Sequence, residues 1–164
     1  NKIPCIGLFG TCGSSKWRDK FIKKYKMKNV EFFNPQNDDW KPEDSAVEAE
    51  HLVNDDIVLF PVTSETFGTG SLAETGYSIL SAIRSNSQRY VIIFIEPKLN
   101  PLLAIENPTA AKESQNARAI VLAHLKKAKN PNVFIVKSLD EMLDLSLRLY
   151  KITQMLSEIE EDFQ

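Results

Sequence analysis

The sequence contains few of the residues that build disulfide frameworks and metal-binding motifs. Two cysteines and two histidines occur among its 164 residues. Cys5 falls in a predicted strand and Cys12 in the loop that follows it, so we expect free thiols in a reducing compartment. His51 and His124 lie far apart and match no zinc motif. The sequence therefore predicts neither a bound metal nor a cofactor.

Long apolar runs and a strong net charge are also missing. No apolar run approaches the length that spans a bilayer, and the first residues show no signal-peptide pattern. The net charge of −2 provides no basic field for nucleic acid. With 43% apolar and 26% charged residues and no internal repeat, the chain fits one globular domain over residues 1–164. We expect a cytoplasmic protein without a membrane or nucleic-acid partner.

Strand patterns alternate with helical patterns along the chain. Strands are predicted at residues 3–9, 30–33, 56–62, 90–95 and 132–136, and helices at residues 15–27, 43–54, 70–86, 110–129 and 139–160. Ser14 or Ser15 is the expected cap of the first helix, and a long connection with Pro97, Pro101 and Pro108 follows the fourth strand. This alternation predicts the α/β class, as a flavodoxin-like doubly wound five-stranded parallel sheet with strand order 2-1-3-4-5. Right-handed crossovers then bring the carboxyl ends of strands one and three together, where ligands bind in such folds.

The loop after the first strand is small, polar and followed by a helix. Its sequence, Gly10-Thr-Cys-Gly-Ser-Ser-Lys16, has neither the spacing of a dinucleotide-binding glycine motif nor the ending of a phosphate-binding P-loop. Backbone N–H groups and hydroxyls in this loop are candidates to hold a sugar hydroxyl or a phosphate. The candidate residues are Gly10, Thr11, Ser14 and Ser15. The alternative is an ordinary strand-to-helix turn.

A second polar loop follows the second strand and contains a tryptophan beside acidic residues. An aromatic ring next to amide and carboxylate groups suits a heterocyclic base and a hydroxylated sugar. We therefore expect substrate contacts from this loop, at Asn34, Asp38, Asp39 and Trp40. The alternative is a turn in which Trp40 is anchored in the core.

Carboxylates on the second helix are candidates for the same crevice. Glu48 precedes Leu52 by one helical turn, and Leu52 is expected to pack toward the sheet. One of Glu48 and Glu50 is therefore a candidate to point into the crevice, and the alternative is a charged, solvated helix face. Asp55 and Asp56 begin the third strand at the opposite end, where we expect structural roles.

Glu74 is the strongest candidate for chemistry. The segment Phe67-Gly-Thr-Gly-Ser-Leu-Ala-Glu-Thr-Gly-Tyr77 follows the third strand and opens a helix. Its small residues leave space for a ligand, with Gly70 and Ser71 as further candidate contacts. A carboxylate near a helix N-terminus is expected to stay ionised, so that it acts as a nucleophile or stabilises an oxocarbenium-like sugar. The alternative is a favourable first-turn charge without a function.

In their order and spacing, these segments resemble the nucleoside 2-deoxyribosyltransferase (like) family and its relatives, the nucleotide N-glycoside hydrolases. The resemblance extends from residue 6 to about residue 139. It is carried by the Gly10–Ser15 loop with Trp17-Arg18, by Phe33-Asn-Pro with Asp38-Asp39-Trp40, by Val47-Glu-Ala-Glu50, and by Ser71-Leu-Ala-Glu74-Thr-Gly-Tyr77. The later segment Asn116-Ala-Arg-Ala-Ile-Val-Leu-Ala-His-Leu125 is similar to a helix of one branch of the family.

The resemblance implies cleavage of the N-glycosidic bond of a deoxynucleoside. Glu74 would be the nucleophile and would form a deoxyribosyl ester, which a second base or water then attacks. Glu48 matches a supporting acid that is usually Asp in the family, whereas a family Asp six residues before the nucleophile corresponds to Gly68 here. Family members complete their sites with a residue from a neighbouring subunit, which implies a homodimer or a higher homo-oligomer. The broad apolar surface of the final helix also favours a subunit contact.

Two alternatives remain open at this point. Gly68-Thr-Gly-Ser-Leu-Ala-Glu74 is also similar to a segment of the cytokinin-activating phosphoribohydrolases, and a non-catalytic nucleotide-binding module is the alternative from another class. For an enzyme, the hydroxyls near the first helix, together with Lys16 and Arg18, tilt the expectation toward a nucleoside 5′-monophosphate. That expectation fails if these two cations face water.

Overall fold

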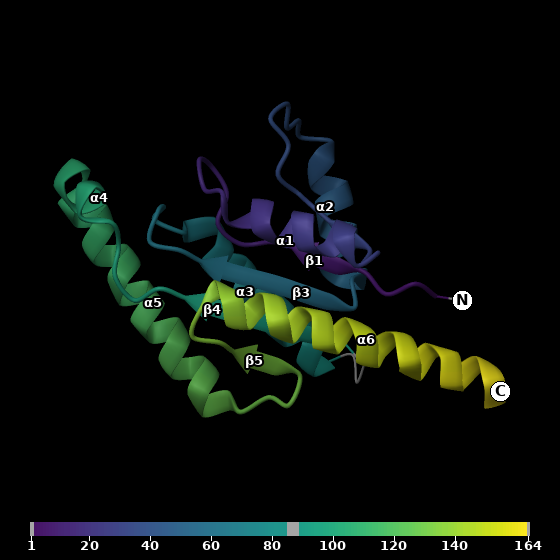
Figure 1. The fold of residues 1–164 in the computed structure, drawn as a ribbon. Coiled ribbons are helices and arrows are strands. Elements are labelled where there is room, and N and C mark those ends of the chain that lie inside the picture. The colour runs from purple at the N-terminus through teal and green to yellow at the C-terminus, as the bar shows by residue number, and fades with distance from the viewer. Residues whose placement is uncertain (1, 85–88, 164) are drawn as a thin grey trace.

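A five-stranded parallel sheet forms the centre of the molecule (Figure 1). The computed structural model describes residues 2–84 and 89–163. The strands are β1 (Ile6–Leu8), β2 (Phe32–Phe33), β3 (Ile57–Val62), β4 (Tyr90–Ile95) and β5 (Val133–Ile135). Their order is β2-β1-β3-β4-β5, and Ile6 of β1 aligns with both Phe32 of β2 and Ile57 of β3. The predicted α/β class and strand order are therefore confirmed.

Helices cover both faces of this sheet. They are α1 (Trp17–Met27), α2 (Asp44–Asn54), α3 (Thr69–Arg84), α4 (Pro101–Glu106), α5 (Pro108–Ala128) and α6 (Leu139–Phe163). Because successive strand residues point to opposite faces, β3 contributes to two apolar layers. Ile57 and Leu59 pack with α1 and α6, whereas Val58 and Phe60 pack with α3 and α5. All residues of β3 are buried, as expected for a strand covered on both sides.

The helices differ from the sequence prediction in two respects. The predicted cap at Ser14 or Ser15 is wrong, because α1 begins at Trp17 after Lys16 and makes no side-chain cap hydrogen bond. The long connection predicted after β4 contains the short helix α4. Asn100 and Asn107 each accept a backbone N–H at the start of α4 and α5, and a proline follows each of them. The predicted end of the third helix, at residue 86, lies outside the described residues.

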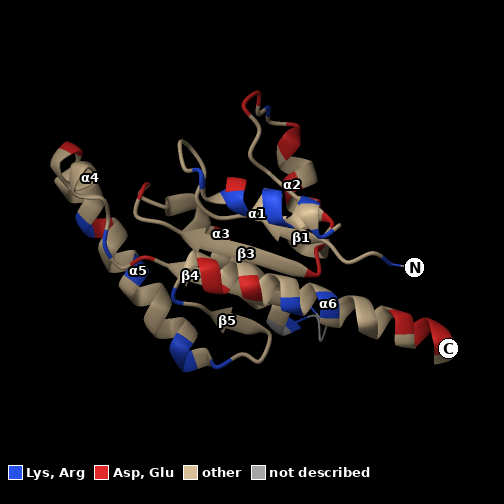
Figure 2. Ribbon diagram, in the orientation of Figure 1, with Lys and Arg blue, Asp and Glu red and all other residues tan. Residues whose placement is uncertain are grey.

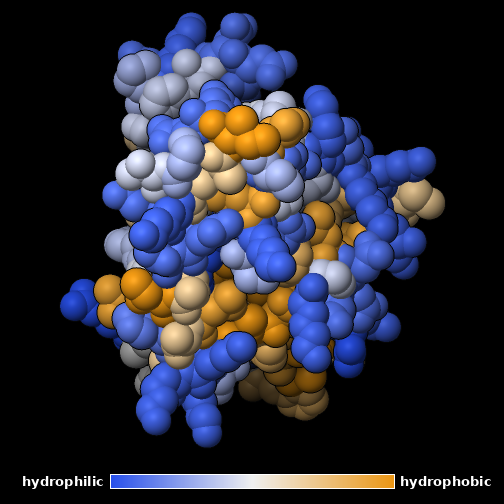
Figure 3. Space-filling view, turned by 90° about the vertical axis from the view of Figure 1, so that its left-hand side faces the viewer, coloured by the Kyte–Doolittle hydropathy of each residue, from blue (hydrophilic) through white to orange (hydrophobic). Residues whose placement is uncertain are grey.

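The charges on the surface are mixed in sign. Figure 2 shows acidic and basic residues side by side on several helices, with acidic residues at both ends of α6. Figure 3, a view from the side that carries α4, shows apolar patches among hydrophilic residues. Leu102 and Ile105 of α4 are among the exposed large apolar side chains. Within the described ranges, no helix combines the length and the apolar character needed to cross a membrane.

Candidate functional site

A cavity of about 650 Å³ opens where the carboxyl ends of β1 and β3 lie side by side. This is the switch point of the sheet, as expected for a fold with this strand order. Three segments form its wall: the loop after β1, the loop after β2 together with α2, and the loop after β3 with the start of α3. The lining residues are Phe9, Gly10, Thr11, Cys12, Gly13, Pro35, Gln36, Asn37, Asp38, Trp40, Glu48, Thr66, Gly68, Thr69, Gly70, Ser71 and Glu74.

Most of the residues predicted from the sequence lie in this wall. They are Gly10, Thr11, Asp38, Trp40, Glu48, Gly70, Ser71 and Glu74. Sequence reasoning did not assign a role to Phe9, Cys12, Gly13, Pro35, Gln36, Asn37, Thr66 and Thr69. These residues lie in the same three segments as the predicted ones. They could have been predicted by including every residue of these three segments, because the backbone path of each segment decides which of its residues face the cavity.

Four predicted substrate contacts lie outside the cavity wall: Ser14, Ser15, Asn34 and Asp39. Ser14 is exposed, whereas Ser15 is buried with a hydroxyl that has no hydrogen-bond partner. Asn34 accepts the backbone N–H of Gln36 through Oδ1 at 3.1 Å, so its side chain shapes the turn. Asp39 is exposed, and its carboxylate has no role at the cavity.

Glu74 lies on the second turn of α3, half-buried against the cavity. Burial raises the pKa of its carboxyl group, the negative charge of Glu48 raises it further, and the charge of Arg18 opposes them. The direction is opposite to the one expected from a helix N-terminus, whose influence fades within the first turn. The carboxyl group of Glu74 therefore holds its proton to a higher pH than an exposed glutamate does.

Glu48 is held in place by the aromatic residue of the second loop. The indole Nε1 of Trp40 donates a hydrogen bond of 2.7 Å to Glu48 Oε1. Trp40 is 51% exposed, so the alternative in which it is anchored in the core is wrong. Of the two glutamates proposed from α2, Glu48 lines the cavity and Glu50 is exposed outside it. The arrangement brings an aromatic face and two carboxylates to one cavity.

Arg18 is buried beneath the loop after β1, where its guanidinium group bonds to protein atoms. Nε donates to the carbonyl of Leu8 at 2.9 Å, and Nη1 donates to the carbonyl of Thr11 at 2.6 Å and to Gln36 Oε1 at 3.2 Å. Nη2 reaches the carbonyl of Gly10 at 3.4 Å and Cys12 Sγ at 3.6 Å. All five donor positions are used.

Arg18 is therefore a structural group of this loop, although its charge acts on Glu74 through the cavity wall. Lys16 is exposed and does not line the cavity. The positions of Lys16 and Arg18 therefore do not support the expectation that they bind a phosphate.

A second buried arginine, Arg118 of α5, holds the loop after β3. Its Nε donates to Ser114 Oγ at 3.2 Å. Nη1 and Nη2 donate to backbone carbonyl oxygens at 2.8 to 3.1 Å, and the acceptors are Val62, Glu96, Thr63 and Thr66. This loop leads directly into the start of α3. Each of two cavity walls is thus supported by one buried guanidinium group.

Glycine is required at two positions of the wall. Gly10 has φ +94°, and a Cβ there would lie 2.5 Å from the carbonyl oxygen of Pro61. Gly68 has φ +69°, and a Cβ there would lie 2.6 Å from Val62 Cγ1. Other residues are strained in such a conformation. A residue with a side chain is therefore disfavoured at both positions.

The cavity presents carboxylates, an aromatic ring and backbone N–H groups, which suits a sugar bearing a heterocyclic base. Asp38, Glu48 and Glu74 are the carboxylates in its wall. Within the described ranges, Cys5, His51 and Asp55 form a group close enough to share a metal ion, at the opposite end of the strands. The buried positions of Asp55 and Asp56, with their hydrogen bonds, agree with the structural roles expected for them.

Comparison with known proteins found structural likenesses but no match in sequence. No protein-family model and no curated protein matches the chain. The fold is similar to the crystal structure of a conserved protein from Enterococcus faecalis V583, with 12% sequence identity and a TM-score of 0.49. The alignment covers 87% of this chain and 96% of that one.

Proposed function

We propose that the protein cleaves the N-glycosidic bond of a nucleoside or its 5′-monophosphate at this cavity, and transfers the sugar to another base or to water. The observation that carries the proposal is the position of Glu74. It is a half-buried carboxylate with a raised pKa, facing a cavity next to a second carboxylate. Perturbed acids in a cleft mark candidate catalytic sites. The cavity volume of about 650 Å³ lies in the range of small-molecule sites.

Glu74 supplies the nucleophile in this proposal. One carboxylate oxygen attacks the anomeric carbon, the bond from that carbon to the base nitrogen breaks, and its electron pair leaves with the base, which takes up a proton from solvent. The product is a glycosyl ester of Glu74. Water or a second base then attacks the same carbon and releases a proton to solvent, and the ester bond breaks to regenerate the carboxylate. Two displacements of this kind retain the configuration at the anomeric carbon.

Glu48 and Trp40 act as positioning groups in this scheme. The hydrogen bond from Trp40 fixes one oxygen of Glu48, which leaves the other to accept a hydrogen bond from a sugar hydroxyl. The half-exposed indole face offers a surface on which a heterocyclic base stacks. Glu48 also adds the negative charge that raises the pKa of Glu74. Removal of the Glu48 carboxylate should therefore weaken both the orientation of the substrate and the nucleophilicity of Glu74.

The two cations and the two serines that were expected to favour a phosphate lie outside the cavity wall. The guanidinium of Arg18 is committed to protein acceptors, and Ser14 lies outside the cavity wall. The start of α3 does reach the cavity, and backbone N–H groups at a helix start bind anions. Both the nucleoside and the 5′-monophosphate therefore belong in the first assay.

The test is a panel assay with the purified protein. Deoxynucleosides, deoxynucleoside 5′-monophosphates and ribonucleoside 5′-monophosphates are each incubated with and without a free acceptor base, and products are separated by chromatography. A transferase forms a new nucleoside, and a hydrolase forms free base and free sugar. Cleavage confined to ribonucleoside monophosphates would favour a phosphoribohydrolase. Binding without any cleavage across the panel would identify a nucleotide-binding module and overturn the proposal.

Variants on one helix provide a matched control. Glu48→Gln should lower kcat/KM at least tenfold, since it removes a charge from the cavity wall. Glu50→Gln, two residues along the same helix and exposed outside the cavity, should leave kcat/KM unchanged. Equal effects of the two substitutions would contradict the assignment of Glu48.

A further inference from the structure

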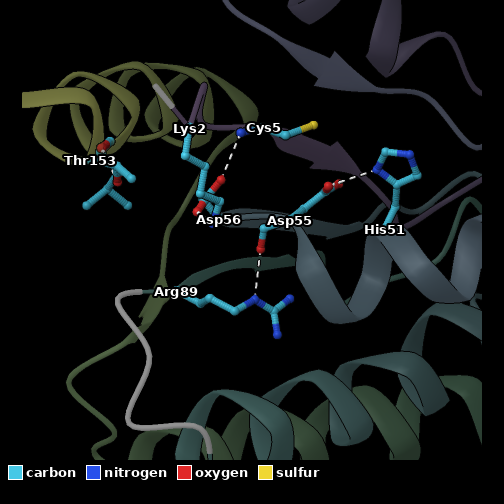
Figure 4. A network of polar contacts seen from close by, with 8 residues as sticks. Lys2, Cys5, His51, Asp55, Asp56, Arg89 and Thr153 are labelled. Carbon is cyan, nitrogen blue, oxygen red and sulfur yellow. Dashed lines mark hydrogen bonds and ion pairs between the residues drawn. The ribbon is translucent and has the colours of Figure 1, made fainter. Parts of the chain in front are cut away.

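Three potential metal ligands gather at the edge of the sheet opposite the cavity. Cys5 lies just before β1, Asp55 just before β3, and His51 on the last turn of α2. Their ligand atoms all lie within 4.8 Å of one another. In Figure 4 the thiol of Cys5 and the carboxylate of Asp55 both point toward the ring of His51. The sequence did not predict this group because the fold, rather than a motif spacing, brings it together.

The carboxylate of Asp55 is incompletely satisfied in its buried position. Asp55 is 4% exposed, and its Oδ1 lies 2.8 Å from His51 Nδ1. Its second oxygen, Oδ2, is buried and accepts no hydrogen bond from an N–H or O–H group, and the partner of this carboxylate besides His51 is the thiol of Cys5, a weak donor. A cation would recover the free energy that this incomplete pairing costs. The incompletely paired carboxylate supports a bound cation beside the grouping of the three ligand types.

The backbone leaves room for this carboxylate. A Cβ at Gly7 of β1 would lie 2.7 Å from Asp55 Oδ2, so a side chain there would expel the oxygen. On the other side, the ring of His51 stacks on Phe33 with centroids 3.7 Å apart, which fixes its plane. The neighbouring chain is also held, because Arg89 Nε donates to the carbonyl of Asp55 at 2.8 Å. These contacts hold His51 and Asp55 in place.

The surrounding charges favour a cation. Asp56 Oδ2 accepts the backbone N–H of Cys5 at 3.0 Å, so a further carboxylate lies beside the group. Carboxylates attract a divalent ion, whose binding would release the thiol proton of Cys5 to solvent. Lys2, the nearby amine, is bonded to Asp56 Oδ1 at 2.8 Å and not to the cluster.

We propose that Cys5, His51 and Asp55 form a binding site for a zinc ion, with the fourth position taken by water. Thiolate, imidazole and carboxylate are the ligand types that Zn²⁺ accepts in proteins. With bonds of about 2.0 to 2.3 Å, tetrahedral ligand atoms lie about 3.3 to 3.6 Å apart. Nδ1 of His51 lies 2.8 Å from Oδ1 of Asp55, and all ligand atoms of the group lie within 4.8 Å of one another, which is compatible with this spacing. A small adjustment of side chains therefore completes the site, which is independent of the cavity and its chemistry.

The test uses Co²⁺ as a spectroscopic substitute for zinc. The reduced protein is titrated with CoCl2, and the thiolate-to-cobalt charge-transfer absorption is followed. We expect one equivalent to bind with this absorption, and ZnCl2 to displace the cobalt. Cys5→Ala should abolish the absorption, whereas Cys12→Ala, which removes the other cysteine, should leave it unchanged. ZnCl2 should also raise the Tm of the wild type and not that of Cys5→Ala.

A second variant keeps the proposal testable if Cys5→Ala does not fold. His51→Gln, at a partly exposed position, should weaken cobalt binding at least tenfold while the circular dichroism spectrum stays that of the wild type. Failure of the wild type to develop the charge-transfer absorption would overturn the proposal. So would its loss in Cys12→Ala, or equal cobalt affinity in His51→Gln and the wild type.

Discussion

Replacement of Arg118 by methionine should destabilise the protein strongly although the side chain carries no predicted chemistry. Arg118 is 0% exposed and donates to four backbone carbonyl oxygens and one hydroxyl. The carbonyl of Val62 keeps another donor, the N–H of Glu96 at 2.9 Å. The carbonyls of Thr63, Thr66 and Glu96 would each lose the donor that Arg118 supplies. Each unsatisfied buried group costs about 1 to 3 kcal/mol, and Thr66 and Glu96 are half-buried, so the gross loss lies in the lower part of the range of about 3 to 9 kcal/mol.

Part of this loss is offset, because the variant no longer buries a cation. We therefore expect a net decrease of at least about 2 kcal/mol in the free energy of unfolding, at the upper end of single-residue effects. Urea denaturation followed by circular dichroism measures it, with the slope checked for two-state behaviour. Arg148→Met on α6 is the control, since Arg148 is exposed and lies 3.7 Å from Asp144. It should change stability by less than about 0.5 kcal/mol. Equal effects of the two substitutions would refute this account of Arg118.

Three further predictions concern the pH profile, a glycine and the assembly of the protein. Glu48→Gln removes a charge that raises the pKa of Glu74, so the acid limb of kcat/KM should move to lower pH; a limb that stays in place would contradict this coupling. Gly68→Ala should lower the free energy of unfolding by about 2 to 4 kcal/mol, from its positive φ and the clash with Val62, whereas Gly76→Ala in an open helical position should not destabilise. Apolar residues on the last turns of α6 are exposed, including Ile159 at 52%, so we predict a homodimer or larger assembly that Ile159→Glu disrupts. A monomer mass in light scattering at micromolar concentration would contradict the last prediction.

The alternation of strands and helices could be predicted because it depends on local patterns, and the strand order was expected because it is a common order for that alternation. β3 and β4 are unbroken apolar runs, and the helices between strands have their own periodicity, so the chain alternates visibly between the two. Boundaries were less predictable. Serines stand where a helix cap is expected, yet α1 begins two residues after Ser15. The first residues of the helix, Trp17 and Arg18, are buried below the loop.

The candidate site was predictable in its segments and less so in its side chains. Glu74, Glu48 and Trp40 lie in segments whose position at the switch point follows from the topology. The roles of Arg18 and Arg118 could not be predicted, because their acceptors are backbone carbonyls as far as 56 positions away along the chain. A sequence shows an arginine but not whether its donors are already used. For this reason Arg18 was expected to favour a phosphate, although its guanidinium group supports the loop after β1.

The measurement that tests the central claim most directly is the rate of base release by Glu74→Gln. The substitution keeps the size of the side chain and removes the nucleophilic carboxylate from the cavity. With the substrate that the wild type cleaves best, the account predicts that kcat falls at least about a thousandfold while the Tm stays within a few degrees of that of the wild type. Base release by Glu74→Gln within tenfold of the wild-type rate would contradict the assignment of Glu74 as the nucleophile.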